Sequence, residues 1–140
     1  MHLRRALLYV PGDDAHKALK ASLTGADCIC LDLEDGVAPT QKGTAREEVL
    51  ESLRTIDFHA SEKMVRINAL SSGLAEEDLN VVLPGNPNGI YLPKVNQLAG
   101  PVLKYPHPIN PGIRRCLDEG IADLLDPDMT VAARLVLAHH

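Results

Sequence analysis

Apolar and polar residues alternate along four short stretches in the first 95 residues of the chain, and each stretch predicts a β-strand. The most regular stretch is residues 28–36. There Ile29, Leu31 and Leu33 share one face, while two thiols followed by two carboxylates share the other. The other three predicted strands are residues 6–10, 63–68 and 89–95.

Apolar residues at helical spacing follow the first three predicted strands and predict helices at 15–23, 44–56 and 74–83. Asp13 and Asp14 can cap the first helix, and Thr44 with Glu47 has the spacing of a capping box for the second. This alternation predicts right-handed crossovers and a parallel sheet. We therefore predict an α/β fold, a partial (β/α)8 TIM barrel made of its first four strand–helix units. A doubly wound open sheet is the alternative, although the chain has neither a G-x-G-x-x-G loop nor a P-loop.

Seven of the ten prolines lie within residues 84–111, and the proline-rich run at 100–112 is predicted to be irregular. Pro93 should lie at a strand end or at an unpaired edge position, because proline cannot donate to a ladder. Apolar spacing then predicts C-terminal helices at 113–125 and 129–138. With 140 residues the chain is too short for a complete eight-stranded barrel, which needs about 250. We predict the N-terminal half of a barrel domain at 1–96 and a divergent Pro-rich and helical tail at 97–140.

Composition and charge argue against several classes of protein. A net charge of -5 without a basic run argues against a nucleic-acid partner, and no apolar run approaches the roughly 20 residues that cross a membrane. The cysteines form neither a disulfide framework nor a zinc motif, so Cys28 and Cys30 are predicted to be buried free thiols. The basic N-terminal residues lead directly into the first strand, which leaves no room for a signal or transit peptide, and we expect an intracellular chain.

Polar side chains come at or just past the carboxyl ends of three predicted strands. Tyr9 belongs to the first strand, residues 32–35 to the second and Arg66 to the third. Because these ends meet at one edge of a parallel sheet, where barrels keep their active sites, we expect the side chains to converge. An arginine there can hold a carboxylate with two hydrogen bonds. The alternative is that Arg66 forms a structural ion pair with Glu34 or Asp32.

Five short motifs carry a resemblance to a known family. They are RALLYVPG at 5–12, LDLEDGV at 31–37, Lys42 with Ala45 and Arg46, VRIN at 65–68, and LPKV at 92–95. In this order and spacing they resemble the citrate lyase beta subunit-like family of the HpcH/HpaI aldolase superfamily, and residues 71–79 resemble its mitochondrial citramalyl-CoA lyase branch. The resemblance implies a (β/α)8 barrel, usually a trimer, that uses Mg²⁺ to cleave or form a carbon–carbon bond between an acyl-CoA and a 2-keto acid.

The resemblance also implies roles for individual residues. Arg66 would hold the carboxylate of the hydroxy acid, and Glu34 and Asp35 would orient Arg66 or the water shell of Mg²⁺. The residues expected at the mouth where the phosphates of CoA pass are Tyr9, Lys17, Lys20 and Lys42. For the lysines, ordinary solvated helix charges are the alternative interpretation.

The chain departs from the family pattern at the metal. The two carboxylates that bind it directly lie in later motifs resembling F-V-E-T and G-x-E-D, and neither motif occurs in this sequence, so we assign no metal ligand. One hypothesis is a Mg²⁺-dependent lyase that cleaves citramalyl-CoA or malyl-CoA to acetyl-CoA and a 2-keto acid. Another is a truncated, non-catalytic module that binds acyl-CoA or a carboxylate, and a third is a 2-keto acid aldolase of the same superfamily. The resemblance further implies a homo-oligomer and a mitochondrial location, with the cytoplasm as the alternative.

Overall fold

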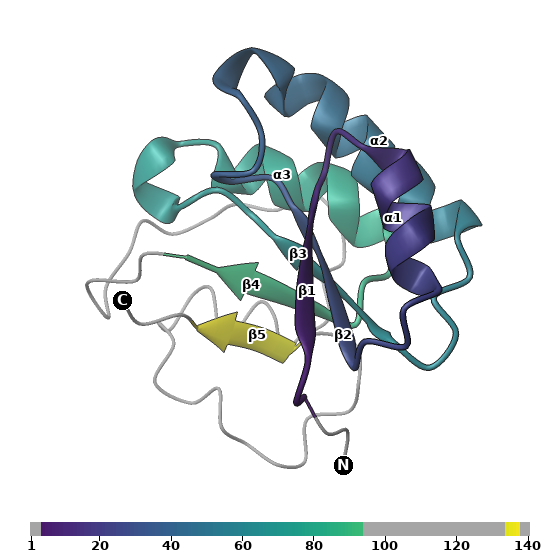
Figure 1. The fold of residues 1–140 in the computed structure, drawn as a ribbon. Helices are drawn as coiled ribbons and strands as arrows, with labels where there is room; N and C mark the ends of the chain where they lie inside the picture. Colours follow the sequence, from purple (N-terminus) through teal and green to yellow (C-terminus); the bar gives the residue numbers. More distant parts are fainter. Residues whose placement is uncertain (1–3, 94–133, 138–140) are drawn as a thin grey trace.

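Parallel strands lie side by side in chain order in the sheet of this protein (Figure 1). The computed structural model describes residues 4–93 and 134–137, and within these ranges the sheet has five strands in the order β1-β2-β3-β4-β5. Their bounds are β1 Leu7–Pro11, β2 Cys28–Asp32, β3 Glu62–Arg66, β4 Gly89–Leu92 and β5 Arg134–Leu137. All neighbouring pairs are parallel, which confirms the predicted kind of sheet.

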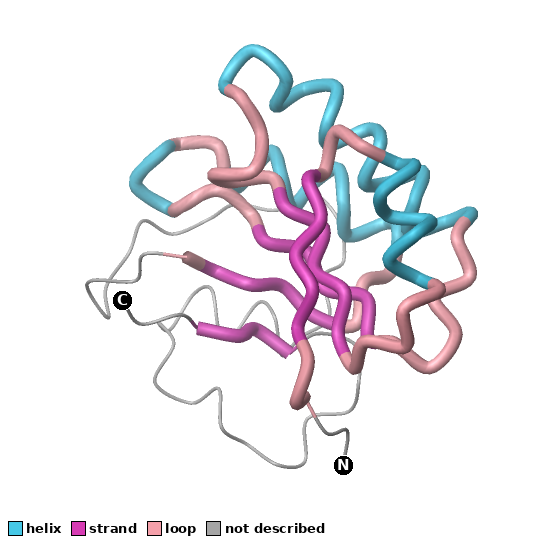
Figure 2. Tube along the Cα trace, viewed as in Figure 1, coloured by secondary structure: helices cyan, strands magenta, loops and turns pink. Residues whose placement is uncertain are grey.

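A helix follows each of the first three strands, as the sequence predicts. The helices are α1 Ala15–Ser22, α2 Lys42–Thr55 and α3 Ala75–Val82. Short 3-10 turns flank the last two, at Pro39–Gln41, Leu70–Ser72 and Leu83–Gly85. Figure 2 shows the three helices together on one side of the sheet. None of the helices in the described part of the chain is long and apolar enough to span a membrane.

The face of the sheet under the helices carries the main hydrophobic core. Ile29, Leu31 and Leu33 are at most 1% exposed there, and they belong to one cluster with Val49 of α2 and Leu79 of α3. Burial of these side chains contributes the largest favourable free-energy change to folding, because little of their apolar surface remains in water. The predicted two-residue period of the second strand is thereby confirmed.

The other face of the sheet carries a smaller cluster. Cys28, Cys30 and Met64 are buried in it, and the half-buried Tyr91 packs against them. Both cysteines are free thiols, as predicted. The two faces therefore differ as they do in a barrel, where helices cover the outside and side chains from the strands fill the interior.

Two tyrosines indicate that this second face is concave. Tyr9 lies on β1 and Tyr91 on β4, with two strands between them, yet their ring centroids are 6.1 Å apart. Three strand spacings of a flat sheet would separate β1 from β4 by about 14 Å. The two rings meet because the sheet curves toward them, which is the curvature of a partial barrel.

The structure corrects one predicted helix start. The prediction that Thr44 and Glu47 form a capping box is wrong, because α2 begins at Lys42 and contains both residues. Pro39 opens a 3-10 turn that leads directly into α2, and a proline at this position already has a backbone angle suited to a helix. For α1 the prediction holds, since the side chain of Asp14 accepts the backbone N–H of Lys17 at 2.9 Å.

The helix predicted at 129–138 is also wrong over Arg134–Leu137, which forms β5 beside β4. A short apolar run has no clear helical or strand period, and the unpaired edge of β4 offers backbone partners to it. The helix predicted at 113–125 lies outside the described residues. Pro93 directly follows β4, so it lies at a strand end as expected.

Candidate anion-binding site

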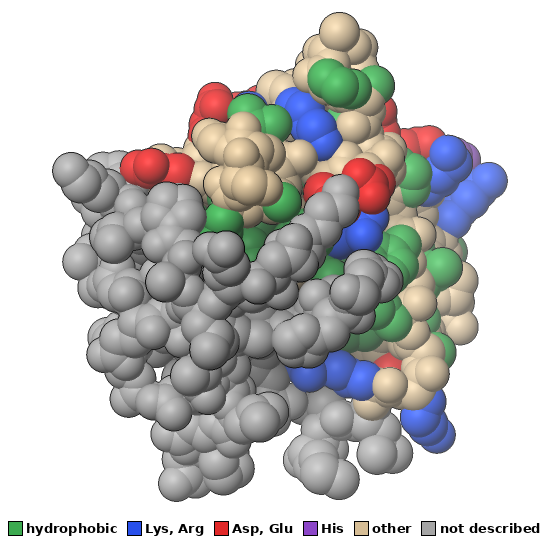
Figure 3. All heavy atoms as spheres, turned by 90° about the vertical axis from the view of Figure 1, so that its left-hand side faces the viewer, with side chains coloured by type: hydrophobic (Ala, Val, Ile, Leu, Met, Phe, Trp, Pro, Cys, Tyr) green, Lys and Arg blue, Asp and Glu red, His purple; other side chains and the backbone are tan. Residues whose placement is uncertain are grey.

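Three strands, β2, β3 and β4, bring polar side chains to the same level at their carboxyl ends, and Pro11 of β1 lies at that level beside them. The register pairs Pro11 with Asp32, Asp32 with Arg66, and Arg66 with Tyr91. From the side drawn in Figure 3, acidic and basic side chains lie next to one another on the upper part of the described surface. The predicted convergence at this edge of the sheet is therefore present.

Arg66 and Asp32 form the centre of the site. Arg66 Nε donates to Asp32 Oδ1 at 2.8 Å and Nη2 donates to Oδ2 at 2.6 Å, which is the bidentate geometry typical of strong arginine–carboxylate pairs. The same carboxylate accepts the backbone N–H groups of Glu34 at 2.9 Å and Gly36 at 2.8 Å. Asp32 thus orients the arginine and also folds the loop after β2 around it.

Gly36 is needed in this loop because there is no space for a side chain. A Cβ atom at this position would lie 2.6 Å from Asp32 Oδ2, which is closer than atoms can approach. Gly12 is restricted in the same way, since its Cβ would lie 2.6 Å from the carbonyl oxygen of Asp32. Both glycines therefore allow backbone to pass close to the aspartate.

Both members of the pair are charged at neutral pH. Burial raises the pKa of Asp32, but hydrogen bonds from Arg66 and from the N–H groups of Glu34 and Gly36 outweigh burial, and the pKa is lowered overall. The hydrogen bond to Asp32 raises the pKa of Arg66 above its already high usual value. The guanidinium is consequently a fixed cation at the end of β3.

The remaining donors of Arg66 face the other residues of the site. Arg66 Nη1 lies 3.5 Å from Glu34 Oε2, and the guanidinium carbon lies 4.8 Å from the centre of the Tyr9 ring, within the range of a cation–π contact. The Arg66 side chain keeps 18% of its surface exposed. The pair with Asp32 uses the Nε and Nη2 edge, so Nη1 is left to face Glu34.

An aromatic wall borders the arginine. Tyr9 is 40% exposed and packs edge-to-face against Tyr91. Burial, followed by the neighbouring Tyr91, raises the pKa of Tyr9, so its hydroxyl stays protonated at neutral pH. No role for Tyr91 was predicted from the sequence. The alternation of β4 was the available signal, because it places Tyr91 level with Arg66 on the concave face.

The remaining predicted site residues lie in three different environments. Lys42 Nζ donates to the backbone oxygens of Leu33 at 2.6 Å and Glu34 at 2.5 Å, so it binds the end of β2. Lys17 and Lys20 lie exposed on α1, and Lys17 pairs with Asp14, the residue before the helix, at 3.1 Å. Asp35 is exposed in the loop after β2, where its backbone N–H donates to Glu34 Oε2 at 3.3 Å.

A second buried polar cluster lies next to the site and was not predicted. Asp78 of α3, 0% exposed, accepts hydrogen bonds from Arg46 Nε of α2 at 2.7 Å and from Asn68 Nδ2 at 2.7 Å. It also accepts the backbone N–H of Asn68 at 2.8 Å. Arg46 and Asn68 belong to the sequence motifs, but nothing in the sequence indicates that they meet.

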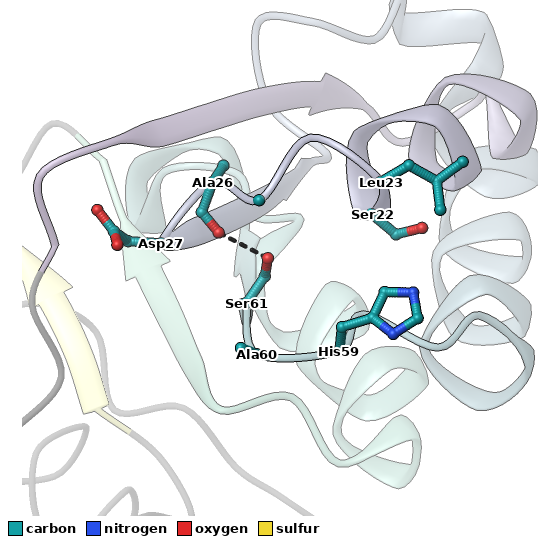
Figure 4. A pocket seen from close by; sticks show the side chains of 8 residues that line it. Ser22, Leu23, Ala26, Asp27, His59, Ala60 and Ser61 are labelled. Carbon is teal, nitrogen blue, oxygen red and sulfur yellow. Dashed lines mark hydrogen bonds between the residues drawn. The ribbon is translucent and has the colours of Figure 1, made fainter.

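A depression of about 330 Å³ lies at the other end of the sheet (Figure 4). It is lined by Ser22, Leu23, Gly25, Ala26, Asp27, His59, Ala60 and Ser61. Its polar groups are largely bonded within the protein: Ser61 Oγ donates to the oxygen of Ala26 at 2.6 Å, and Asp27 accepts hydrogen bonds from Arg5 and Ala6. This depression is therefore not our candidate site.

The described residues do not fit a direct Mg²⁺ site. Among them, no group of three or more histidine, cysteine, aspartate or glutamate side chains is arranged to hold a metal ion. Asp32 is already committed to four hydrogen bonds. Glu34 and Asp35 would at most contact the water shell of the ion.

Together, the curved parallel sheet and the arginine at its carboxyl edge define an α/β protein of the barrel type with a candidate anion-binding site. Residues 5–105 match the family HpcH/HpaI aldolase/citrate lyase, and the chain belongs to this family. The predicted family and fold class are confirmed.

Two curated relatives and one solved structure indicate which members the chain is similar to. It is 49% identical over 94 residues to mitochondrial citramalyl-CoA lyase of Homo sapiens, covering 66% of this chain and 28% of that protein. It is 39% identical over 97 residues to citrate lyase subunit beta of Leuconostoc mesenteroides subsp. cremoris, covering 69% and 32%. The Mycobacterium tuberculosis citrate lyase beta subunit, complexed with oxaloacetate and magnesium, superposes with a TM-score of 0.55 at 36% identity, covering 70% and 43%. The chain thus spans about a third of the length of these curated relatives.

Proposed function

We propose that the protein is a Mg²⁺-dependent carbon–carbon lyase that cleaves citramalyl-CoA or malyl-CoA to acetyl-CoA and a 2-keto acid. The observation that carries the proposal is the ion pair of Arg66 with Asp32, which fixes a cation at the carboxyl end of β3. The 49% identity to a citramalyl-CoA lyase supports the substrate class, and the magnesium in the related solved structure supports the metal.

Arg66 is proposed to bind the carboxylate of the hydroxy acid before cleavage and of the keto acid after it. In carbon–carbon cleavage of this kind the hydroxyl group loses its proton as its carbon becomes the carbonyl of the keto acid. The electron pair of the broken bond passes to the thioester fragment, which takes up a proton to become acetyl-CoA. The carboxylate stays anionic throughout, so a fixed guanidinium holds both substrate and product in register. Tyr9 would pack beside the bound acid, because its ring already contacts Arg66.

Glu34 and Asp35 are proposed to orient Arg66 and the water shell of Mg²⁺. Glu34 is the better supported of the two, since its carboxylate lies 3.5 Å from Arg66 Nη1. Mg²⁺ retains several waters and few direct protein ligands, so it suits carboxylates that act through water. The direct ligands would come from outside the described residues.

Lys17 and Lys20 are proposed to contact the phosphates of CoA together with Tyr9. The two lysines lie exposed on α1, which follows the carboxyl end of β1. Lys42, the fourth residue expected at this mouth, is better explained as a residue that binds the end of β2, because its ammonium already donates to two carbonyl oxygens. A homo-oligomer and a mitochondrial location are proposed from the family and from the mitochondrial relative.

A non-catalytic binding module is the second candidate function. The observation in its favour is that the described residues include no cluster of metal-binding side chains. Such a module would keep Arg66 as a carboxylate site and would bind acyl-CoA or a keto acid without turnover.

The test measures acetyl-CoA release from citramalyl-CoA and malyl-CoA by the purified chain, with Mg²⁺ and with EDTA, alongside calorimetric binding of two keto acids: pyruvate, which cleavage of citramalyl-CoA releases, and oxaloacetate. We expect Mg²⁺-dependent turnover that Arg66→Ala abolishes and that Arg54→Ala leaves unchanged, because Arg54 is an exposed arginine at the far end of α2. Binding of oxaloacetate without turnover would favour the binding module. A folded chain with neither turnover nor Arg66-dependent binding would refute both candidates.

A further inference from the structure

Three residues from different sequence motifs, none of which has a role in the proposed site, meet at one buried carboxylate. Asp78 lies on α3 and is 0% exposed. Its two oxygens accept three hydrogen bonds, from Arg46 on α2 and from both the backbone and the side chain of Asn68 after β3. A buried carboxylate is stable only when it is paired and hydrogen-bonded in this way.

The hydrogen bond to the Asn68 backbone continues the pairing of β3 beyond the end of the strand. The carbonyl of Arg66 accepts the N–H of Leu33 at 2.8 Å, and the N–H of Ile67 donates to the carbonyl of Tyr91 at 3.1 Å. The next N–H along the chain, that of Asn68, donates to Asp78 rather than to a strand. Asp78 therefore holds the backbone two residues after Arg66.

Helix α2 links Asp78 to the end of β2, the strand that carries Asp32. Its Lys42 binds the carbonyl oxygens at the end of β2, and its Arg46, one turn later, binds Asp78. One helix thus fixes the ends of both strands that carry the ion pair of Asp32 with Arg66. Displacement of either end would misalign a pair whose oxygens and nitrogens lie 2.6 to 2.8 Å apart.

We propose that Asp78 is a positioning residue for Arg66. It acts through Asn68, keeps the end of β3 level with the end of β2, and so holds the guanidinium where a substrate carboxylate can reach it. This proposal rests on the proposed function of Arg66 for its effect on ligand binding, whereas its effect on the position of Arg66 is independent of that function. A misplacement of about 1 Å in such a group can cost about 100-fold in activity.

The test variant is Asp78→Asn, which keeps the shape of the side chain and removes its charge. Glu77→Gln is the matched control, because Glu77 is the adjacent acid and contacts the same Arg46, at 3.3 Å, from the surface. Val82→Ala is the stability control, because it shortens a buried apolar side chain of the same helix and removes no hydrogen bond. Each protein is measured by the NMR signal of the Arg66 Nε–H, by hydrogen exchange of the Asn68 amide, and by calorimetric binding of oxaloacetate.

We expect Asp78→Asn to shift or broaden the Arg66 signal, to speed exchange at Asn68 and to weaken oxaloacetate binding at least about tenfold. Glu77→Gln and Val82→Ala should leave the Arg66 signal and the affinity unchanged. If Asp78→Asn behaves like Val82→Ala, with lower stability but an unchanged Arg66 signal, Asp78 is merely structural and the proposal is refuted. If the wild-type chain shows neither turnover nor binding of a keto acid while Asp78→Asn still moves the Arg66 signal, the proposed function fails and the positioning role stands.

Discussion

Asp32 and Arg66 lie opposite each other on neighbouring parallel strands, and a bidentate ion pair joins their side chains. The same aspartate accepts two backbone N–H groups of the loop after β2. One buried carboxylate therefore organises the cation of the site and the loop that carries Glu34. Groups of this kind hold a functional side chain in place without contacting the ligand themselves.

Asp32→Asn should lower the free energy of unfolding at pH 7 by about 2 kcal/mol, because hydrogen bonds to a charged partner are lost while Arg66 stays largely buried. The difference in the free energy of unfolding between the wild type and Asp32→Asn should depend on pH. The pKa of Asp32 is lowered in the folded state, so its stabilising effect is complete above the unfolded-state pKa of about 3.9 and disappears as pH falls through the lower folded-state value.

Urea unfolding of both proteins at pH 7 and at steps down to about pH 2 measures this difference, with every other carboxylate common to the two proteins. The two unfolding free energies should converge at the acid end. A constant difference across the whole range would mean that the ionised form of Asp32 does not stabilise the fold.

Gly36→Ala and Gly43→Ala should change stability in opposite directions. An added Cβ at Gly36 would collide with Asp32 Oδ2, and Arg66 prevents that oxygen from moving away, so we expect a loss of about 1 to 3 kcal/mol. Gly43 lies inside α2 with no atom within 4 Å of an added Cβ, so alanine there should stabilise the helix by about 0.5 to 1 kcal/mol. Thermal unfolding of the two variants measures both effects, and a destabilised Gly43→Ala would contradict the helix argument.

Much of the site could be predicted from the two-residue period of the strands. That period places Asp32 and Arg66 on the concave face and the apolar residues of β2 under the helices, as observed. The same rule would have placed Tyr91 beside them. The sequence left open whether Arg66 pairs with Asp32 or with Glu34, because sequence spacing gives the face of a side chain and not its rotamer.

Other features depend on tertiary structure. Asp78 looks like an ordinary acidic residue in the first turn of α3, and only the packing of α3 against α2 brings it to Arg46. Lys42 looks like a surface charge, and only the proximity of α2 to the end of β2 gives it carbonyl partners. The strand at Arg134–Leu137 likewise depends on the free edge of β4, a long-range partner that local spacing does not reveal.

Lys42→Met should separate the structural lysine from those proposed to bind CoA. Methionine keeps the apolar stem but cannot donate to Leu33 and Glu34, so we expect a loss of about 1 to 3 kcal/mol with little change in the affinity for acetyl-CoA. Lys17→Met and Lys20→Met should do the reverse, since both side chains are exposed: stability within about 0.5 kcal/mol of wild type and weaker binding. Urea unfolding and titration with acetyl-CoA measure the two properties. Equal weakening of binding by all three variants would mean that Lys42 also contacts CoA, as first predicted.

The thiols of β2 should react slowly in the folded protein. Burial, and then the neighbouring Glu62, raises the pKa of Cys28 to about 11, and burial also raises the pKa of Cys30. Only the thiolate reacts with iodoacetamide, so at pH 8 a pKa of about 11 leaves roughly 100-fold less reactive thiolate at Cys28 than an ordinary cysteine has. In a Cys116→Ser background, mass spectrometry should find both thiols unmodified over a period that fully alkylates them in urea. Rapid alkylation of Cys28 or Cys30 without denaturant would show that the concave face is open to solvent. The part of the proposed site beside Tyr91 would then be open to solvent as well.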